Sequence, residues 1–257
     1  MREIPIGLEL YSVRNSLAKD MPGTLHKIKE YGYETVEYFM PLDYNCSCEM
    51  KRVLDNENLP FSSWHLGIDN LYEDKIDETI EIANNVGCKN IIIPAIGHEY
   101  YESFDKLIEI LGKMNLMSKK LNDNGIRLGY HNHAEEFKTF KDGKTIWTLM
   151  CENTDENIIM QYDTGNALSG NADISKELLT LKGRAGIAHI KPYSLKDKFE
   201  VLIGDDDVDY NQIFNFLKGD GGCFSYIVEY EGISKYDEME AVKLCLDNLV
   251  TKYGSVL

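Results

Sequence analysis

Four stretches of the sequence end a short apolar run with histidine or a carboxylate residue. These stretches are Tyr130-His131-Asn132-His133, Gln161-Tyr162-Asp163-Thr164, Ala188-His189-Ile190-Lys191 and Ile227-Val228-Glu229-Tyr230-Glu231. Imidazole nitrogen combined with carboxylate oxygen suits Mn, Co, Zn or Fe better than Ca or an all-oxygen Mg site. A single histidine or carboxylate at a strand end is often only structural. Four in register on consecutive strands predict a divalent metal site.

Side-chain alternation along a strand narrows the choice of ligands. His131 and His133 share one face of their strand, as do Glu229 and Glu231. In each pair the earlier residue lies deeper, at the expected level of the other two ligands. We therefore predict four metal ligands: His131, Asp163, His189 and Glu229.

Further polar residues lie at predicted strand ends and could face the same cavity. We predict four substrate-binding residues: Glu9, His65, Asn166 and Glu231. For Glu9 and Glu37, a buried, hydrogen-bonded carboxylate without a role in binding is the alternative. Lys191 could stabilise an oxyanion, and its alternative is a surface lysine.

These residues must be positioned by a repeating unit of helix and strand. Helix-like stretches end in glycine and lead into a short apolar run, as at Gly32, Gly87 and Gly125, which is typical of αβ connections. Candidate strands begin near Pro5, Thr35, Phe61, Asn90, Arg127, Ile158, Ala185 and Ser225. Eight such units predict an α/β fold, a (β/α)8 TIM barrel that forms a single domain over residues 1–257. An open, doubly wound sheet is the alternative, although no G-x-G-x-x-G follows the first strand.

Composition limits the partners of this chain. Its 257 residues carry a formal net charge of -16, which disfavours nucleic acids and anionic membranes. No apolar run approaches the roughly 18 residues of a membrane span, and no apolar signal segment follows the first methionine. The six cysteines form no C-x-x-C pair, so we expect reduced thiols and a cytoplasmic protein. Whether the chain forms a homo-oligomer is left open.

The chain resembles the sugar phosphate isomerase/epimerase group, the xylose isomerase-like TIM barrels. The stretches that carry the resemblance include Gly7-Leu8-Glu9-Leu10-Tyr11-Ser12-Val13-Arg14, Tyr130-His131-Asn132-His133-Ala134-Glu135-Glu136-Phe137, Asp163-Thr164-Gly165-Asn166 and His189-Ile190-Lys191. The resemblance places the family's metal positions on His131, Asp163, His189 and Glu229. This is the set that the strand ends already predict.

One position departs from the family pattern. The ketose 3-epimerases that resemble this chain carry a glutamate on strand 5, paired with the strand 8 glutamate for proton transfer. Here the strand 5 position is His131, and a neutral histidine bound to metal cannot act as that base. We predict that Glu136 or His133 moves the proton instead, with Lys191 and Glu9 as further candidates.

These observations together predict an enzyme of the isomerase/epimerase kind. It would act on a sugar, keto-sugar or polyol by abstracting a proton next to a metal-polarised carbonyl. The cofactor would be one divalent ion, with Mn, Zn, Co and Mg as candidates. The alternatives are a sugar dehydratase or lyase and a non-catalytic carbohydrate-binding barrel. The negative charge argues against an abasic-site endonuclease.

Overall fold

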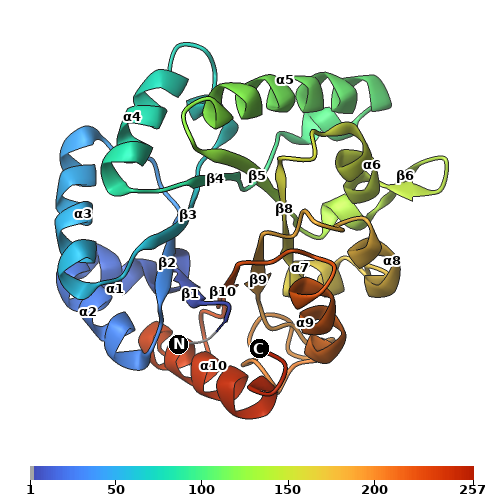
Figure 1. Ribbon diagram of the computed structural model, residues 1–257. Helices are drawn as coiled ribbons and strands as arrows, with labels where there is room; N and C mark the ends of the chain where they lie inside the picture. Colours follow the sequence, from blue (N-terminus) through green and yellow to red (C-terminus); the bar gives the residue numbers. More distant parts are fainter. Residues whose placement is uncertain (1–2) are drawn as a thin grey trace.

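The computed structural model describes residues 3–257, and its central feature is a closed barrel of parallel strands (Figure 1). Around the barrel the strands follow the order β1-β10-β9-β8-β5-β4-β3-β2. Their bounds are β1 Ile6–Glu9, β2 Thr35–Tyr38, β3 Phe61–His65, β4 Asn90–Ile93, β5 Arg127–His131, β8 Ile159–Asp163, β9 Ile187–Ile190 and β10 Ser225–Val228. Each begins within two residues of its predicted start. The predicted closed barrel is confirmed, and the alternative of an open, doubly wound sheet is wrong.

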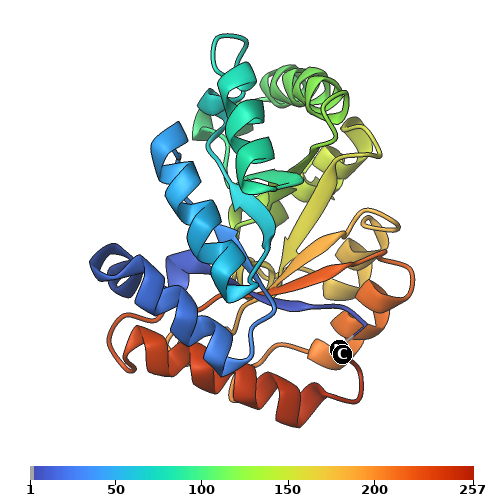
Figure 2. The ribbon, with the colours of Figure 1, turned by 60° about the vertical axis from the view of Figure 1, so that its left-hand side comes forward.

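Helices surround the barrel because their apolar faces pack against the outside of the strands (Figure 2). Their bounds are α1 Arg14–Lys19, α2 Met21–Tyr31, α3 Tyr44–Glu57, α4 Ile76–Val86, α5 Phe104–Asn122, α6 Ile146–Asn153, α7 Thr164–Ser169, α8 Ile174–Leu179, α9 Tyr210–Lys218 and α10 Glu238–Tyr253. A two-stranded hairpin, β6 Thr139–Lys141 with β7 Lys144–Thr145, follows β5. Among the described residues, no helix is both long and apolar enough to cross a membrane.

Glycine ends two of these helices in the left-handed conformation. Gly32 follows α2 with φ of 103°, and Gly87 follows α4 with φ of 78°. Glycine adopts this conformation without the steric cost that a β-carbon imposes, so each helix ends sharply and the chain enters the next strand. These turns fix where β2 and β4 begin, and therefore which residues reach their far ends.

Inside the barrel, a layer of isoleucines is followed by polar side chains toward the carboxyl ends of the strands. Ile92, Ile159, Ile187 and Ile227 pack together as a cluster separate from the core that the helices cover. Alternate residues of a strand share a face, so the chain continues upward from these isoleucines with polar side chains. The resulting series are Ile159, Gln161 and Asp163 on β8, Ile187, His189 and Lys191 through β9, and Ile227, Glu229 and Glu231 through β10. Polar side chains thus cover the inside of the barrel at the carboxyl ends of its strands.

Candidate metal centre

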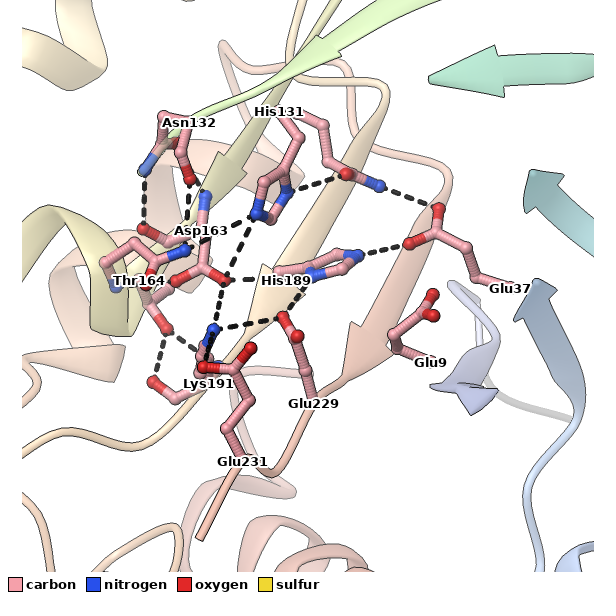
Figure 3. Close-up of polar contacts among 12 residues, drawn as sticks. Glu9, Glu37, His131, Asn132, Asp163, Thr164, His189, Lys191, Glu229 and Glu231 are labelled. Carbon is pink, nitrogen blue, oxygen red and sulfur yellow. Dashed lines mark hydrogen bonds and ion pairs between the residues drawn. The ribbon is translucent and has the colours of Figure 1, made fainter. Parts of the chain in front are cut away.

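The four predicted ligands converge at the carboxyl ends of four neighbouring strands (Figure 3). His131, Asp163, His189 and Glu229 are buried, and each offers one ligand atom within 4.8 Å of the others. The Oδ2 atom of Asp163 lies 3.8 Å from His131 Nε2 and 3.7 Å from His189 Nδ1. Oε2 of Glu229 lies 2.8 Å from His189 Nδ1. Two imidazoles and two carboxylates at this separation could hold a divalent ion.

The carboxylate of Asp163 is held so that one oxygen is left free. Its Oδ1 accepts a hydrogen bond of 2.7 Å from the backbone N–H of Asn166 at the start of α7. Asn132 fixes the backbone of Asp163 from both sides, accepting from its N–H at 2.8 Å and donating to its carbonyl at 3.3 Å. Asp163 Oδ2 is buried and has no hydrogen-bond partner among the described residues. A buried carboxylate oxygen without a partner is costly, and a bound cation would compensate it.

The two histidines use their second ring nitrogens to contact a deeper layer. His131 Nδ1 lies 2.9 Å from Gln161 Oε1, which can only accept, so this nitrogen carries the proton. His189 Nε2 contacts the Glu37 carboxylate. These bonds leave His131 Nε2 and His189 Nδ1 as the nitrogens that face Asp163. Metal-binding histidines in proteins usually have such a partner on the other nitrogen, so the arrangement fits a metal site.

Glu37 is the centre of this deeper layer. Its carboxylate accepts a hydrogen bond of 2.8 Å from Gln161 Nε2, lies 3.0 Å from His65 Nε2 and also contacts Ser63 Oγ. Burial alone would raise the pKa of Glu37, but His65 and His189 hold it well below its usual range. Glu37 and His65 also belong to a second group of potential ligands with Glu9 and His189. Because Glu37 already has these partners, we take the group around Asp163 as the candidate centre.

Charge in the cluster also favours a cation. Burial lowers the pKa of His131 well below its usual range, which keeps this ring neutral. Burial would lower the pKa of His189 too, but the neighbouring carboxylates, Glu37 above all, raise it well above the usual value. Burial and the charge of Glu37 raise the pKa of Glu9, whose Oε2 is buried and has no hydrogen-bond partner within residues 3–257. The carboxylates thus attract positive charge, and a metal ion would supply it.

Lys191 lies beside the predicted ligands and is buried. Its Nζ is 2.8 Å from Glu231 Oε2, 3.4 Å from Glu229 Oε2 and 3.8 Å from Asp163 Oδ2. Burial would lower the pKa of Lys191, but these three carboxylates raise it above its usual value. The side chain is therefore an ammonium group inside the site, and the surface-lysine alternative is wrong.

A cavity of about 290 Å³ opens above the cluster. Its lining residues are Glu9, Tyr11, Phe39, His65, Pro94, His131, His133, Glu229 and Glu231. Three of the predicted substrate-binding residues, Glu9, His65 and Glu231, therefore face it. The fourth, Asn166, packs beneath, with its Nδ2 3.4 Å from His131 Nε2 and 3.1 Å from the Asn132 carbonyl.

The two residues predicted to move a proton differ in their surroundings. His133 is exposed, lines the cavity and packs its ring 5.0 Å from that of His131. Glu136 is buried and outside the cavity lining. Its carboxylate accepts hydrogen bonds from Tyr101 Oη at 2.5 Å, Tyr130 Oη at 2.7 Å and the His133 N–H at 2.8 Å. Glu136 thus holds the backbone that carries His133.

Sequence reasoning missed Gln161 and the aromatic wall of the cavity. Gln161 lies two residues before Asp163, so strand alternation already placed it on the inner face. Tyr11 and Phe39 follow Glu9 and Glu37 by the same spacing and meet edge to face at 5.3 Å. Strand alternation places these residues on the inner face, but their residue types do not indicate which side chains they contact.

The comparisons with known proteins agree with this architecture. The profile of the family described as Xylose isomerase-like TIM barrel matches residues 25–247. The chain belongs to that family. No curated protein matches the sequence.

Solved structures share the fold of this family member over nearly the whole chain. A sugar phosphate isomerase/epimerase from Parabacteroides distasonis is 24% identical, with a TM-score of 0.85, covering 97% of this chain and 94% of its own. A D-allulose 3-epimerase from Methylomonas sp., in complex with D-allulose, is 14% identical, with a TM-score of 0.70 and 98% coverage of both chains. The probable 3-DHS dehydratase involved in petrobactin synthesis from Bacillus anthracis is 14% identical, with a TM-score of 0.72, covering 96% and 99%. At these identities the likeness establishes the fold.

Proposed function

We propose that this protein is a metal-dependent isomerase or epimerase acting on a sugar, keto-sugar or polyol. The observation that carries the proposal is the buried Oδ2 atom of Asp163, which has no hydrogen-bond partner among the described residues and faces His131 and His189 under an open cavity. With Glu229, these residues would hold one divalent ion. When bound, such an ion polarises a carbonyl group and stabilises negative charge on its oxygen. The structural neighbours named as sugar isomerases and epimerases support this class of reaction.

Proton transfer would then fall to residues of the chain that line the cavity. We assign it to His133, which is exposed to the cavity and held by the bond from its N–H to Glu136. The proton would pass from the carbon beside the carbonyl to the imidazole and, in an isomerase, return to the neighbouring carbon. An epimerase would need a second acid that delivers a proton to the opposite face of the same carbon, and Glu9, which also lines the cavity, is the candidate. Lys191 would stabilise negative charge on the substrate with its ammonium group.

A deuterium-exchange experiment tests this assignment. Metal-loaded protein is screened in D2O with a panel of ketoses, and exchange at the carbon beside the carbonyl is followed by NMR. We expect His133→Ala to retain metal and sugar binding but to lose exchange by about 10²–10⁴-fold. Glu136→Gln keeps an oxygen for the His133 N–H, so we expect a smaller loss. The surface histidine His26, on α2, supplies the matched control His26→Ala.

The outcomes separate the candidate functions. If both His133→Ala and Glu136→Gln exchange deuterium at the parental rate, the loop that carries them takes no part in proton transfer. Glu9 and Lys191 would then be the remaining candidates for the base. Sugar binding without exchange in the parental protein would contradict the enzyme and favour a carbohydrate-binding barrel.

Loss of water from the substrate is the second candidate reaction. The observation that favours it is the buried ammonium group of Lys191, which could protonate a departing oxygen next to the site of proton abstraction. A product lighter than the substrate by one water, detected by mass spectrometry, would identify the lyase.

A further inference from the structure

Carboxyl groups dominate the charge around the candidate centre (Figure 3). The five that surround it are Glu9, Glu37, Asp163, Glu229 and Glu231. Lys191 supplies one positive charge, and a divalent ion would supply two more. Even without Glu9, the carboxylates of Glu37, Asp163, Glu229 and Glu231 outnumber these three positive charges, so an anionic substrate would meet net repulsion in a site of low dielectric. The residues that line the cavity include no arginine or lysine, and the charge of Lys191 behind them is already matched by three carboxylates.

Aspartate side chains cap the two helices at whose N-termini a phosphate could bind. In TIM barrels a phosphate commonly binds between the loops after strands 7 and 8, at a helix N-terminus. Here those loops follow β9 and β10. Asp209 caps α9 by accepting from the Gln212 N–H, and Asp237 caps α10 by accepting from the Met239 N–H at 3.0 Å.

The loop after β10 contains a further group of adjacent N–H donors. The backbone N–H groups of Ile233, Ser234 and Lys235 converge on the carboxylate of Glu200, at 2.9 Å for Ile233 and 3.2 Å for each of the other two. Adjacent N–H groups of this kind form an anion-binding concavity. Glu200 belongs to the loop after β9, so the protein's own carboxylate fills the position that a phosphate would need.

The first turn of α1 repeats this pattern. The Glu238 carboxylate accepts from the N–H of Ser16, and from the N–H and side-chain amide of Asn15 at 3.4 and 3.0 Å. Arg14 is the cation next to this turn. Its guanidinium donates to the Tyr11 carbonyl at 2.9 Å and lies over the Tyr11 ring at 4.2 Å, outside the cavity lining.

We infer that the substrate of this site is an uncharged sugar and not a sugar phosphate. The inference rests on the proposed function and names its substrate class. Such a sugar carries hydroxyl groups for His65, Glu231 and the metal ligands, and C–H groups for the wall of Tyr11 and Phe39. We therefore expect a substrate without the phosphate group that the name of the structural neighbour from Parabacteroides distasonis mentions.

Matched substrate pairs test the inference. Each ketopentose or ketohexose of the exchange panel is measured beside its terminal phosphate ester, with metal-loaded protein at low ionic strength. We expect kcat/KM for exchange to be at least about tenfold higher for the free sugar. Added salt should narrow the difference because it screens the repulsion. A phosphate ester that exchanges as fast as its free sugar, or faster, would overturn the inference.

Arg14→Gln is the matched control, because Arg14 stacks on Tyr11, which lines the cavity, and is not among the carboxylate-bound cations of the centre. The inference expects this variant to leave the ratio of the two kcat/KM values unchanged. A selective loss with the phosphate ester would show that Arg14 holds a phosphate, and the inference would be wrong.

A binding measurement separates this inference from the proposed function. If no sugar exchanges, the proposed reaction is wrong, and calorimetric titration of the metal-loaded protein with inorganic phosphate decides the inference by itself. We expect no saturable binding at millimolar phosphate. Saturable binding that a free ketose displaces would overturn the inference even where the reaction is absent.

Discussion

Gln161 should control how tightly the candidate centre binds its ion, although it is not a ligand. Its Oε1 accepts from His131 Nδ1 at 2.9 Å and lies 2.7 Å from His65 Nε2, and its Nε2 donates to Glu37 at 2.8 Å. The Gln161→Met variant keeps a similar volume and removes all three contacts. His131 then loses the acceptor that keeps its proton on Nδ1, so its Nε2 is no longer reserved for a metal ion.

The magnitude follows from the hydrogen bonds that are lost. Removing an outer-shell partner of a metal ligand typically costs about 10–100-fold in metal affinity, which is about 1.4–2.8 kcal/mol. We expect a loss in this range for Mn2+ or Zn2+, measured by calorimetric titration. The variant should also unfold more easily, since buried His65 and Glu37 lose a partner. Gln212, on α9, is the other glutamine of the chain, so Gln212→Met is the matched control.

A spectroscopic measurement makes the test specific to the ring nitrogens. In protein labelled with 15N-histidine, His131 should carry its proton on Nδ1 in the parental chain and a mixture of tautomers in Gln161→Met. Unchanged metal affinity and an unchanged His131 tautomer in a folded Gln161→Met protein would refute the reasoning. Reduced stability alone, with affinity kept, would assign Gln161 a structural role.

Three further predictions follow from the same geometry. Asp163→Asn keeps an oxygen for the Asn166 N–H but removes the charge, so elemental analysis should show loss of metal; full occupancy would contradict the ligand set. Removing a metal present at 100 times its dissociation constant should cost about 2.7 kcal/mol, or roughly 5–10 °C in Tm, and an unchanged Tm after chelation would exclude tight binding. Burial raises the pKa of Asp206 to about 6, above its unfolded value, so its folded form favours the proton. Stability should therefore fall by up to about 3 kcal/mol as pH rises from 4 to 7, and Asp206→Asn, but not Asp207→Asn, should abolish this part of the pH dependence; equal profiles would refute it.

The barrel could be predicted from the sequence because its signals are local. Glycine after a helix and a short apolar run after the glycine locate β2 and β4 within the chain. The predicted start of β9, at Ala185, lies two residues early because Ala185 and Gly186 continue without a polar residue into Ile187. Strand pairing then follows from the right-handed crossover that each βαβ unit adopts.

The candidate ligands could also be predicted, but their partners could not. Strand alternation brings His131 and Asp163 to one end of the barrel whatever surrounds them. The hydrogen-bond partners of Glu136 are Tyr101, which lies in the loop after β4, and Tyr130, which lies on β5. No spacing in the sequence relates these positions, so the carboxylate looked free to act as a base. The same reason hid the contact between Glu200 and the loop after β10.

The cluster is best understood as a site whose charge is balanced only when an ion is bound. Replacing buried charged groups with apolar residues of similar shape often stabilises a protein, so a fold gains little by burying carboxylates around Asp163. The apolar layer of Ile159, Ile187 and Ile227 beneath them shows that the barrel could have been filled in that way. In these three series the charged residues lie at the end of the strands where the cavity opens, and Asp163 Oδ2 has no hydrogen-bond partner among residues 3–257. The nearest histidine and lysine nitrogens lie 3.7–3.8 Å from Asp163 Oδ2, too far for a hydrogen bond. A ligand explains such a buried carboxylate next to an accessible cavity more readily than stability does, so we expect a bound metal to stabilise this end of the barrel.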